Sequence, residues 1–518
     1  AKTLFPYTTL FRSGFTVGTV EADGTRLHSE GLAAQSLVDL QANAGKIEQT
    51  TAGGITGASL RAVAPGGVWL ATAADNDVQT IAGASTAGHF AFKDALDSLE
   101  VGAAGGSTGV SALGTVDLQA VAGSLTQLQA ITGQALRAQA RDAVTLTHVS
   151  NDVSKLAGAA STGNFSYRDA NSVTVATVAA AQDGTVQTAG IRTDVATATI
   201  DLRAAAALGQ DAGAAIAARK ARLVATSVDL KERNNAVSEL AGQATGGGFA
   251  FYGTPDLTVG TVNALDGVTA TGKVDVQAAG NLTLVKRVSG VAEGSEANDE
   301  AVVLRAEKRF FNETGLNQAA IVAAGGRWLV YDNNPLLLNK DMSGLAADRQ
   351  FLLINTRYQD YLPQDVYAKG NGYITTAQAL EPADVSRVTT GHQSVALGNQ
   401  MRQFSLGELT EMTQLNQQIS SAGPVPGSSA AVLSEGVAVP LRVAVPMGRA
   451  FKLDLSTVLG QGRISAIAAT DGSPTAWVSM AGNGQLIGTA PGATELVVSI
   501  VDPGQAQPRK VRVQLQAL

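Results

Sequence analysis

The sequence predicts an all-β protein: a right-handed parallel β-helix (β-solenoid), then a short helix with a linker, then a small β-sandwich. Three observations predict it. Two sequence signatures recur in phase along roughly the first 290 residues. Apolar and polar residues alternate over runs of four to six residues between glycines, which is the period of a strand. Aromatic residues form only 5% of the chain, against 57 glycines, so the fold must be built from thin coils of small and β-branched residues.

The first signature reads Asn-x-Val-x-x-[Ile/Leu]-Ala-Gly and is followed by Gly-x-Phe-x-[Phe/Tyr]. Its three copies start 75 (151 − 76) and 84 (235 − 151) residues apart. Self-similarity at a long, nearly constant period is typical of solenoids. We therefore expect the asparagine and the first aromatic residue of each copy to be structural repeat positions, namely Asn76, Asn151, Asn235, Phe90, Phe165 and Phe249.

The second signature, Val-Asp-Leu-Gln-Ala with small variations, recurs at offsets of 78, 84 and 74 residues. If one coil takes about 20 to 25 residues, each copy holds three or four coils stacked about 4.8 Å apart. The aspartates of successive copies then lie about 14 to 19 Å apart, too far to share a calcium ion. We expect them to be outward-facing charges that keep the strands soluble: Asp39, Asp117, Asp201 and Asp275.

Composition narrows the classes of function. A formal charge of -7 and a pI of about 5.3 predict no nucleic-acid partner. The absence of cysteine excludes disulfides, thiolate catalysis and cysteine-bound zinc. No apolar run reaches the roughly 18 to 20 residues of a transmembrane helix. Residues 1–13 have neither the order of a signal peptide nor the repeat pattern, so we expect an artefact or an unstructured segment there and interpret the chain as a fragment.

The composition of the sequence changes after the repeats, where aromatic residues gather. The run Gly325-Gly326-Arg327-Trp328-Leu329-Val330-Tyr331 is followed some forty residues later by Gly370-Asn371-Gly372-Tyr373-Ile374. These motifs and the upstream repeats resemble the β-helical region of filamentous-haemagglutinin-like proteins, over roughly residues 14–376. The resemblance implies two-partner secretion through an outer-membrane transporter, display on the bacterial surface, and adhesion or aggregation. The family's amino-terminal secretion domain is absent from this sequence.

We expect β-helix repeats over residues 14–300 and a terminal, capping segment over residues 301–376. Aromatic residues are sparse elsewhere, so those gathered here are interpreted as a bulky plug over the last coil in preference to a sugar-binding platform. The expected capping residues are Trp328, Tyr331 and Tyr373.

Residues 377–434 are predicted to be a linker. A capping-box pattern from Ser405 to Glu408, followed by apolar residues at helical spacing, predicts a short amphipathic helix over about 406–420. Residues 421–434, rich in Gly, Pro, Ser and Ala, are predicted to be a hinge. Strand-sized runs over residues 435–518 predict a small β-sandwich that resembles the Ig-like or cadherin-like modules of bacterial surface proteins.

No catalytic, cofactor-binding or metal-binding residue is predicted. The four histidines, at positions 28, 89, 148 and 392, match no metal or general-base spacing. His89 aligns with Asn164 and Gly248 of the other copies, which suggests a variable surface position. The glycine-rich runs lie at turns of the repeat and match no nucleotide-binding loop.

The sequence thus favours a secreted or surface-displayed bacterial adhesin, without catalysis, whose partners are glycans or proteins on host or neighbouring cells. Its affinity is expected to come from many weak contacts along an extended surface. Two alternatives stay open. One is a β-helical polysaccharide lyase or hydrolase, because such enzymes place paired carboxylates on the same fold. The other is the shaft of a contact-dependent toxin carrier.

Overall fold

The computed structural model describes residues 31–377, apart from residues 233, 255, 295–298 and 334–341, together with strand segments at residues 9–11 and 15–17 and between residues 392 and 517. About 3% of the chain is helix, and the fold is a parallel β-solenoid of about 15 turns. The predicted fold class is confirmed. The chain forms two compact units, unit 1 (Ala1–Glu293 with Phe311–Ala324) and unit 2 (Gly294–Phe310 with Gly325–Leu518).

The strands of unit 1 follow the signature copies. Those before the first copy are β1 (Thr9–Phe11), β2 (Phe15–Val17), β3 (Leu32–Ala33), β4 (Leu37–Ala42), β5 (Ile47–Gln49), β6 (Ile55–Val63) and β7 (Val68–Leu70). From the first copy to the second they are β8 (Asp77–Ser85), β9 (Phe90–Asp94), β10 (Leu99–Val101), β13 (Val110–Ala112), β14 (Thr115–Ala120), β15 (Leu125–Gln127), β16 (Ile131–Ala140) and β17 (Val144–Leu146).

The same order continues through the later copies. From the second copy to the third the strands are β18 (Asp152–Ala160), β19 (Phe165–Asp169), β20 (Val173–Val175), β23 (Ile191–Thr193), β24 (Thr199–Ala204), β25 (Ala207–Gln210), β26 (Ile216–Ala225) and β27 (Ser227–Leu230). The last are β28 (Ala236–Ala244), β29 (Phe249–Gly253), β30 (Leu257–Val259), β33 (Val268–Ala270), β34 (Val274–Ala278), β35 (Leu282–Leu284), β36 (Val288–Val291) and β39 (Ile321–Ala324).

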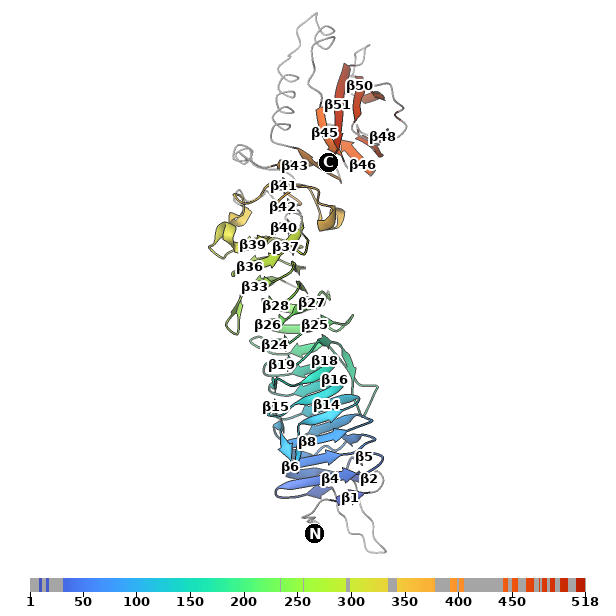
Figure 1. Ribbon diagram of the computed structural model, residues 1–518, viewed down its shortest axis with the longest axis vertical. Helices are drawn as coiled ribbons and strands as arrows, with labels where there is room; N and C mark the ends of the chain where they lie inside the picture. Colours follow the sequence, from blue (N-terminus) through green and yellow to red (C-terminus); the bar gives the residue numbers. More distant parts are fainter. Residues whose placement is uncertain are drawn as a thin grey trace, which may run out of the picture. The chain divides into compact units, whose positions relative to one another are not determined.

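These strands stack in parallel and in chain order (Figure 1). The pairings of β8 with β13, β13 with β16, and β16 with β18 show that three coils separate the first signature copy from the second. The pairings of β18 with β23, β23 with β26, and β26 with β28 show the same for the next copy. One repeat is therefore three coils. The expected count was three or four.

Alternate residues of each strand form the core. Strand β4 alternates between partly exposed and buried positions along its whole length. In register, Leu136 of β16 stacks on Val116 of β14 and beneath Leu156 of β18, and none of the three has exposed surface. The period of two read from the sequence is thus the alternation between the coil interior and its outer face.

The glycine and the phenylalanine of the first signature occupy one place in the coil. A Cβ added to Gly242 would lie 2.1 Å from Cε2 of Phe249. In the preceding copy, a Cβ added to Gly158 would lie 2.5 Å from Cε2 of Phe165. The phenylalanines of all three copies are fully buried. The signature needs glycine because the ring from the next strand fills the space of its side chain.

Unit 2 contains the parallel strands β37 (Glu300–Ala306), β40 (Arg327–Asp332) and β42 (Gly372–Thr375), which pair in that order. Strand β41 (Phe351–Leu353) pairs with β42. Two further sheets follow in sequence, as expected for the small β-sandwich. Their strands are β45 (Leu441–Val445), β51 (Arg509–Ala517), β50 (Thr494–Val501) and β47 (Arg463–Ala469) in one sheet, and β46 (Ala450–Asp454), β49 (Gln485–Thr489) and β48 (Val478–Ala481) in the other.

Three expectations concern the segments outside the repeats. Within residues 1–13, Thr9–Phe11 form β1 and pair in parallel with β4, which the expectation of an unstructured opening did not include. The predicted helix over about 406–420 lies outside the described residues. The predicted hinge over 421–434 also lies outside them.

The packing of glycine against phenylalanine predicts a specific double-mutant result. Gly242→Ala should lower the free energy of unfolding by about 1–3 kcal/mol, because the added methyl overlaps the Phe249 ring. In a Phe249→Leu background the cost of Gly242→Ala should be smaller, as measured by urea unfolding. Gly184→Ala is the matched control, since a Cβ at Gly184 meets nothing within 4 Å. An equal cost in both backgrounds would contradict this packing.

Candidate functional site

The signature asparagine is a buried connector between two coils. Asn76 is fully buried. Its Oδ1 accepts a hydrogen bond from the backbone N–H of Ile55 (2.9 Å), and its Nδ2 donates to the carbonyl oxygens of Leu70 (3.1 Å) and Lys93 (3.0 Å). The partners belong to β6, β7 and β9, so one side chain ties the coil of β6 and β7 to that of β8 and β9.

The same bonds recur at the equivalent positions of the other copies. The Oδ1 of Asn151 accepts from Ile131 N (2.8 Å), and its Nδ2 donates to Leu146 O (3.2 Å) and Arg168 O (3.1 Å). For Asn235 the partners are Ile216 N (2.9 Å), Leu230 O (3.1 Å) and Tyr252 O (3.2 Å). The repeat of the sequence is therefore a repeat of one hydrogen-bond network.

In each copy a glutamine completes the network, and the sequence patterns did not predict this residue. The amide Nε2 of Gln49 donates to Oδ1 of Asn76 (2.6 Å), and Nδ2 of Asn76 donates back to Oε1 of Gln49 (3.2 Å). The same pairs form between Gln127 and Asn151 and between Gln210 and Asn235. The glutamines precede their asparagines by 27, 24 and 25 residues, and that spacing is the signal by which they were detectable.

The aspartates of the second signature are not the solvated charges that the sequence predicted. Asp117 is 1% exposed and Asp201 is 4% exposed, so these aspartates are not solvated surface charges. Each forms an ion pair with an arginine of the next coil, which the sequence reasoning also missed. The pairs are Asp39 with Arg61 (2.7 Å), Asp117 with Arg137 (2.8 Å) and Asp201 with Arg222 (3.1 Å). Asp275, in the last copy, is partly buried and accepts a hydrogen bond from Nε2 of Gln277 (2.9 Å).

Hairpins that protrude from the first coil of each signature copy reach back to these ion pairs. They are β11–β12 (Ala103–Ala104 and Ser107–Thr108), β21–β22 (Thr177–Ala179 and Gln187–Ala189) and β31–β32 (Thr261–Val262 and Leu265–Asp266). Nε of Arg61 donates to Oγ of Ser107 (2.9 Å), and Nε of Arg137 donates to Oγ1 of Thr188 (2.8 Å). Nδ2 of Asn263 donates to Oδ2 of Asp201 (3.4 Å). The aspartates face outward from their strands, but inserted chain covers them.

The alanine of the first signature belongs to the same arrangement. Ala157 lies in register with Arg137, one coil later, and it is fully buried. It packs in a cluster with Ala176 and with Val178 of the hairpin β21–β22. The equivalent residues, Ala82 and Ala241, are also fully buried. A small residue is needed because the base of the hairpin packs against this face.

Two copies also bury a carboxylate in the coil. Oδ2 of Asp94 accepts from the backbone N–H of Val78 (2.7 Å). Oδ2 of Asp169 accepts from Val153 N (3.0 Å) and from the hydroxyl of Tyr167 (2.7 Å). Burial raises the pKa of both carboxyls above the ordinary value, although the N–H donors act in the opposite direction. The third copy has Gly253 at this position.

The predicted capping residues lie inside unit 2. Trp328, Tyr331 and Tyr373 are 1%, 3% and 1% exposed. Nε1 of Trp328 donates to Asp348 Oδ2 (2.9 Å), and the hydroxyl of Tyr373 donates to Asp332 Oδ2 (2.9 Å). None of these rings offers a face to solvent, so they do not form an exposed sugar-binding platform. Tyr373 stands on β42, one strand beyond β40 in the stack, and capping by these residues stays a prediction.

His89, expected at a variable surface position, is half-buried and has a structural partner. Its Nδ1 accepts a hydrogen bond from the backbone N–H of Thr115 (2.9 Å). In the next copy Oδ1 of Asn164 accepts from Thr199 N (2.8 Å) in the same way. Among the described residues no group of three or more His, Asp or Glu side chains is placed to hold a metal ion.

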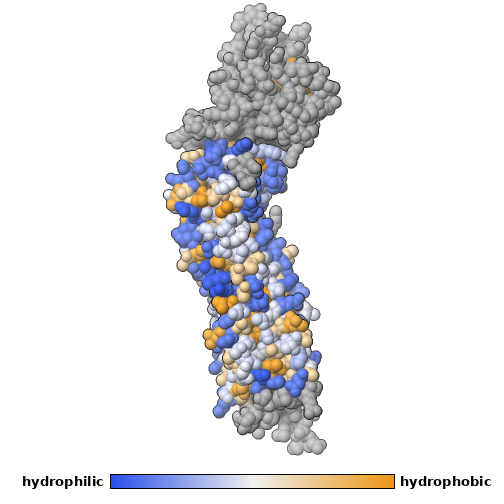
Figure 2. Space-filling model, viewed as in Figure 1, coloured by the Kyte–Doolittle hydropathy of each residue, from blue (hydrophilic) through white to orange (hydrophobic). Residues whose placement is uncertain are grey.

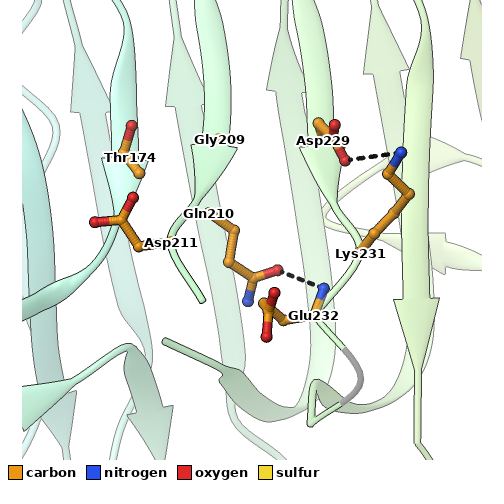
Figure 3. Close-up of a pocket in the computed structure, with 7 residues that line it drawn as sticks. All are labelled: Thr174, Gly209, Gln210, Asp211, Asp229, Lys231 and Glu232. Carbon is orange, nitrogen blue, oxygen red and sulfur yellow. Dashed lines mark hydrogen bonds and ion pairs between the residues drawn. The ribbon is translucent and has the colours of Figure 1, made fainter. Parts of the chain in front are cut away.

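One hollow opens on the outer face of unit 1, with a volume of about 480 Å³ (Figure 3). Gly209 lies at the position that Glu48 and Thr126 occupy in the other copies, immediately before the glutamine that pairs with the signature asparagine. The bare glycine leaves a gap between Thr174 and Asp229, its neighbours in register along the stack. The full lining is Thr174, Gly209, Gln210, Asp211, Asp229, Lys231 and Glu232.

The three carboxylates of the hollow already have partners. Asp211 pairs with Lys155 (3.0 Å), and Asp229 pairs with Lys231 (3.6 Å). Oε2 of Glu232 accepts a hydrogen bond from the backbone N–H of Gly213 (3.1 Å). These groups can exchange hydrogen bonds with a polar ligand, and their side chains remain accessible to it from solvent.

No family model, no curated protein and no solved structure matches this chain. Across the part of the chain that the structure describes, no helix has the length and apolar character needed to cross a membrane. The interpretation of function therefore depends on the repeat itself.

The three-coil networks predict which deletions the fold tolerates. Removal of residues 77–151 joins Asn76 to Asp152 and deletes three whole coils, so the Asn76 network re-forms with Arg168 O in place of Lys93 O. We expect a folded protein with a similar unfolding midpoint by far-UV circular dichroism.

Removal of one coil, residues 117–136, is the matched comparison. It deletes Asp117 and Gln127 and leaves Arg137 and Asn151 without their partners. An uncompensated buried charge costs about 3–5 kcal/mol, so this variant should be far less stable. Equal stability of the two deletions would contradict a three-coil unit.

The buried carboxylates predict a pH dependence of defined sign. Because the pKa of Asp169 is raised in the folded state, the folded chain binds this proton more tightly than the unfolded chain. Its contribution should make the free energy of unfolding rise as the pH falls from neutrality toward the unfolded value of about 3.9. Urea unfolding across this range should show a flatter profile for Asp169→Asn. Asp229→Asn, at an exposed position, should keep the parent slope; a parent-like slope in Asp169→Asn would refute the assignment.

Proposed function

We propose that this chain is the shaft of a secreted or cell-surface bacterial adhesin of the filamentous-haemagglutinin type. It attaches to glycans or proteins of host or neighbouring cells, or aggregates cells, by many weak contacts along its coils. It reaches the cell exterior through an outer-membrane secretion transporter. The observation that carries the proposal is the three-coil repeat with its identical buried networks.

The repeat separates a constant interior from a variable exterior, which is what a recognition shaft requires. The glutamine before each turn is the same in all three copies, whereas the outward residue immediately before it is Glu48, Thr126 or Gly209. On the face shown in Figure 2, hydrophobic residues are scattered among hydrophilic ones. Weak contacts at many such positions add up when many copies of a chain are displayed together.

Cell binding tests the proposal directly. Fluorescent beads that carry many copies of the full chain should bind epithelial cells, bacteria or an array of glycans and matrix proteins. Multivalent display should raise the apparent affinity about 10²–10⁴-fold over the free chain. Beads with heat-unfolded chain are the control. Binding of neither beads nor free chain to any of these surfaces would contradict an adhesive function.

The hollow at Gly209 favours a second candidate, a β-helical polysaccharide lyase or hydrolase. Glycoside hydrolases use two carboxyl groups near the scissile bond, and Asp211, Asp229 and Glu232 line this hollow. A panel of polysaccharides should be assayed for new reducing ends and unsaturated products. Sustained turnover that disappears in Asp229→Asn or Glu232→Gln would replace the adhesin proposal with this one.

A further inference from the structure

The hairpin β21–β22 differs from the other two hairpins in its reach. It spans thirteen residues (177–189), whereas β11–β12 and β31–β32 span six each. Oε1 of Gln182, near its tip, accepts a hydrogen bond from the backbone N–H of Ala71 (2.8 Å), and Nε2 of Gln182 donates to Oγ1 of Thr72. These partners precede Gln182 by 111 and 110 residues. The tip therefore reaches back across a whole repeat, to the coil that precedes Asn76.

We propose that the hairpin β21–β22 is a reversible clasp that locks the coils between Ala71 and Gln182 together when closed and frees their outer face when open. This inference does not depend on the adhesive function.

The base of the clasp is anchored by apolar packing. Val178 is 4% exposed and packs with Ala157, Ala176 and Ala135. At the other end of the hairpin, Oγ1 of Thr188 accepts from Nε of Arg137 and from Nε2 of Gln139 (3.1 Å). The base thus stays attached to its own repeat while the tip moves.

Polar contacts hold the tip. The backbone N–H of Ala181 donates to Oδ2 of Asp117 (3.0 Å), and Gln182 makes the two bonds to Ala71 and Thr72. The next residues, Asp183 to Gln187, are exposed, and a Cβ at Gly184 would meet nothing. Hydrogen bonds of this kind each add little net stability, because water replaces them on opening.

The ion pair beneath the clasp favours opening. Closure holds the carboxylate of Asp117, 1% exposed, against Arg137, 4% exposed. Removal of two charges from water is costly even when they pair, and burial raises the pKa of the Asp117 carboxyl despite the nearby arginine. Opening returns water to the Asp117 carboxylate, which the backbone N–H of Ala181 in the tip covers. The closed state is therefore stabilised by a small margin, as a reversible clasp requires.

Hydrogen exchange measured by mass spectrometry on the full chain tests the clasp. Gln182→Ala removes the acceptor of the Ala71 amide, so exchange in peptides that contain residue 71 should become about tenfold faster. Exchange in β26, two coils beyond the hairpin, should not change. Gln187→Ala, at an exposed position of the same hairpin, is the matched control. Unchanged exchange at Ala71, or a uniform increase along the chain, would overturn the proposal.

A disulfide provides a second, independent test. The chain has no cysteine, so Thr72→Cys with Gln182→Cys introduces the only thiols. The native protein should oxidise to an intramolecular disulfide, and the oxidised form should exchange the Ala181 amide, which donates to Asp117, more slowly than the reduced form. Failure to form this disulfide would count against closure. A disulfide without effect on exchange would count against opening.

Discussion

The structure depends on the pairing of a buried asparagine with a glutamine where one coil turns into the next. A β-solenoid must satisfy the backbone polar groups of its turns away from water, because each unpaired group costs about as much as a lost hydrogen bond. The side chain of Asn235 satisfies one N–H and two carbonyl groups, and Nε2 of Gln210 donates to the same Oδ1 of Asn235 that accepts from the backbone. The register of successive coils follows, because these bonds form in only one alignment.

The outer layer is built on this fixed interior. Once the coils are aligned, the aspartate of one coil meets the arginine of the next, and a hairpin from the following coil covers both. Only the outward positions that a hairpin covers are restricted in residue type. The remaining outward positions vary from copy to copy. All three hairpins reach back beyond their own signature copy, and the long hairpin β21–β22 reaches furthest, to Ala71 and Thr72.

Much of the fold was predictable from the sequence, because strand period and long-range self-similarity are local patterns. The repeat positions at Asn151 and Phe165 follow from them, and both are fully buried. The partners were not predicted: Gln127 and Arg137 each lie a full coil away from the residue they bind, and both residue types are common elsewhere in the chain. Asp117 was misinterpreted because alternation shows which face a residue occupies, but not that an insertion sixty residues later covers it. The hollow at Gly209 arises because glycine has no side chain at this position, and no sequence motif predicts it.

The central claim is that the paired amides lock the coils. A double-mutant cycle on Gln210 and Asn235, with each residue changed to alanine alone and together, measures their coupling by urea unfolding. A locked pair predicts strong non-additivity, with a coupling energy of about 1–3 kcal/mol. Additive effects, within about 0.3–0.5 kcal/mol, would show that the two amides act independently and would contradict the account.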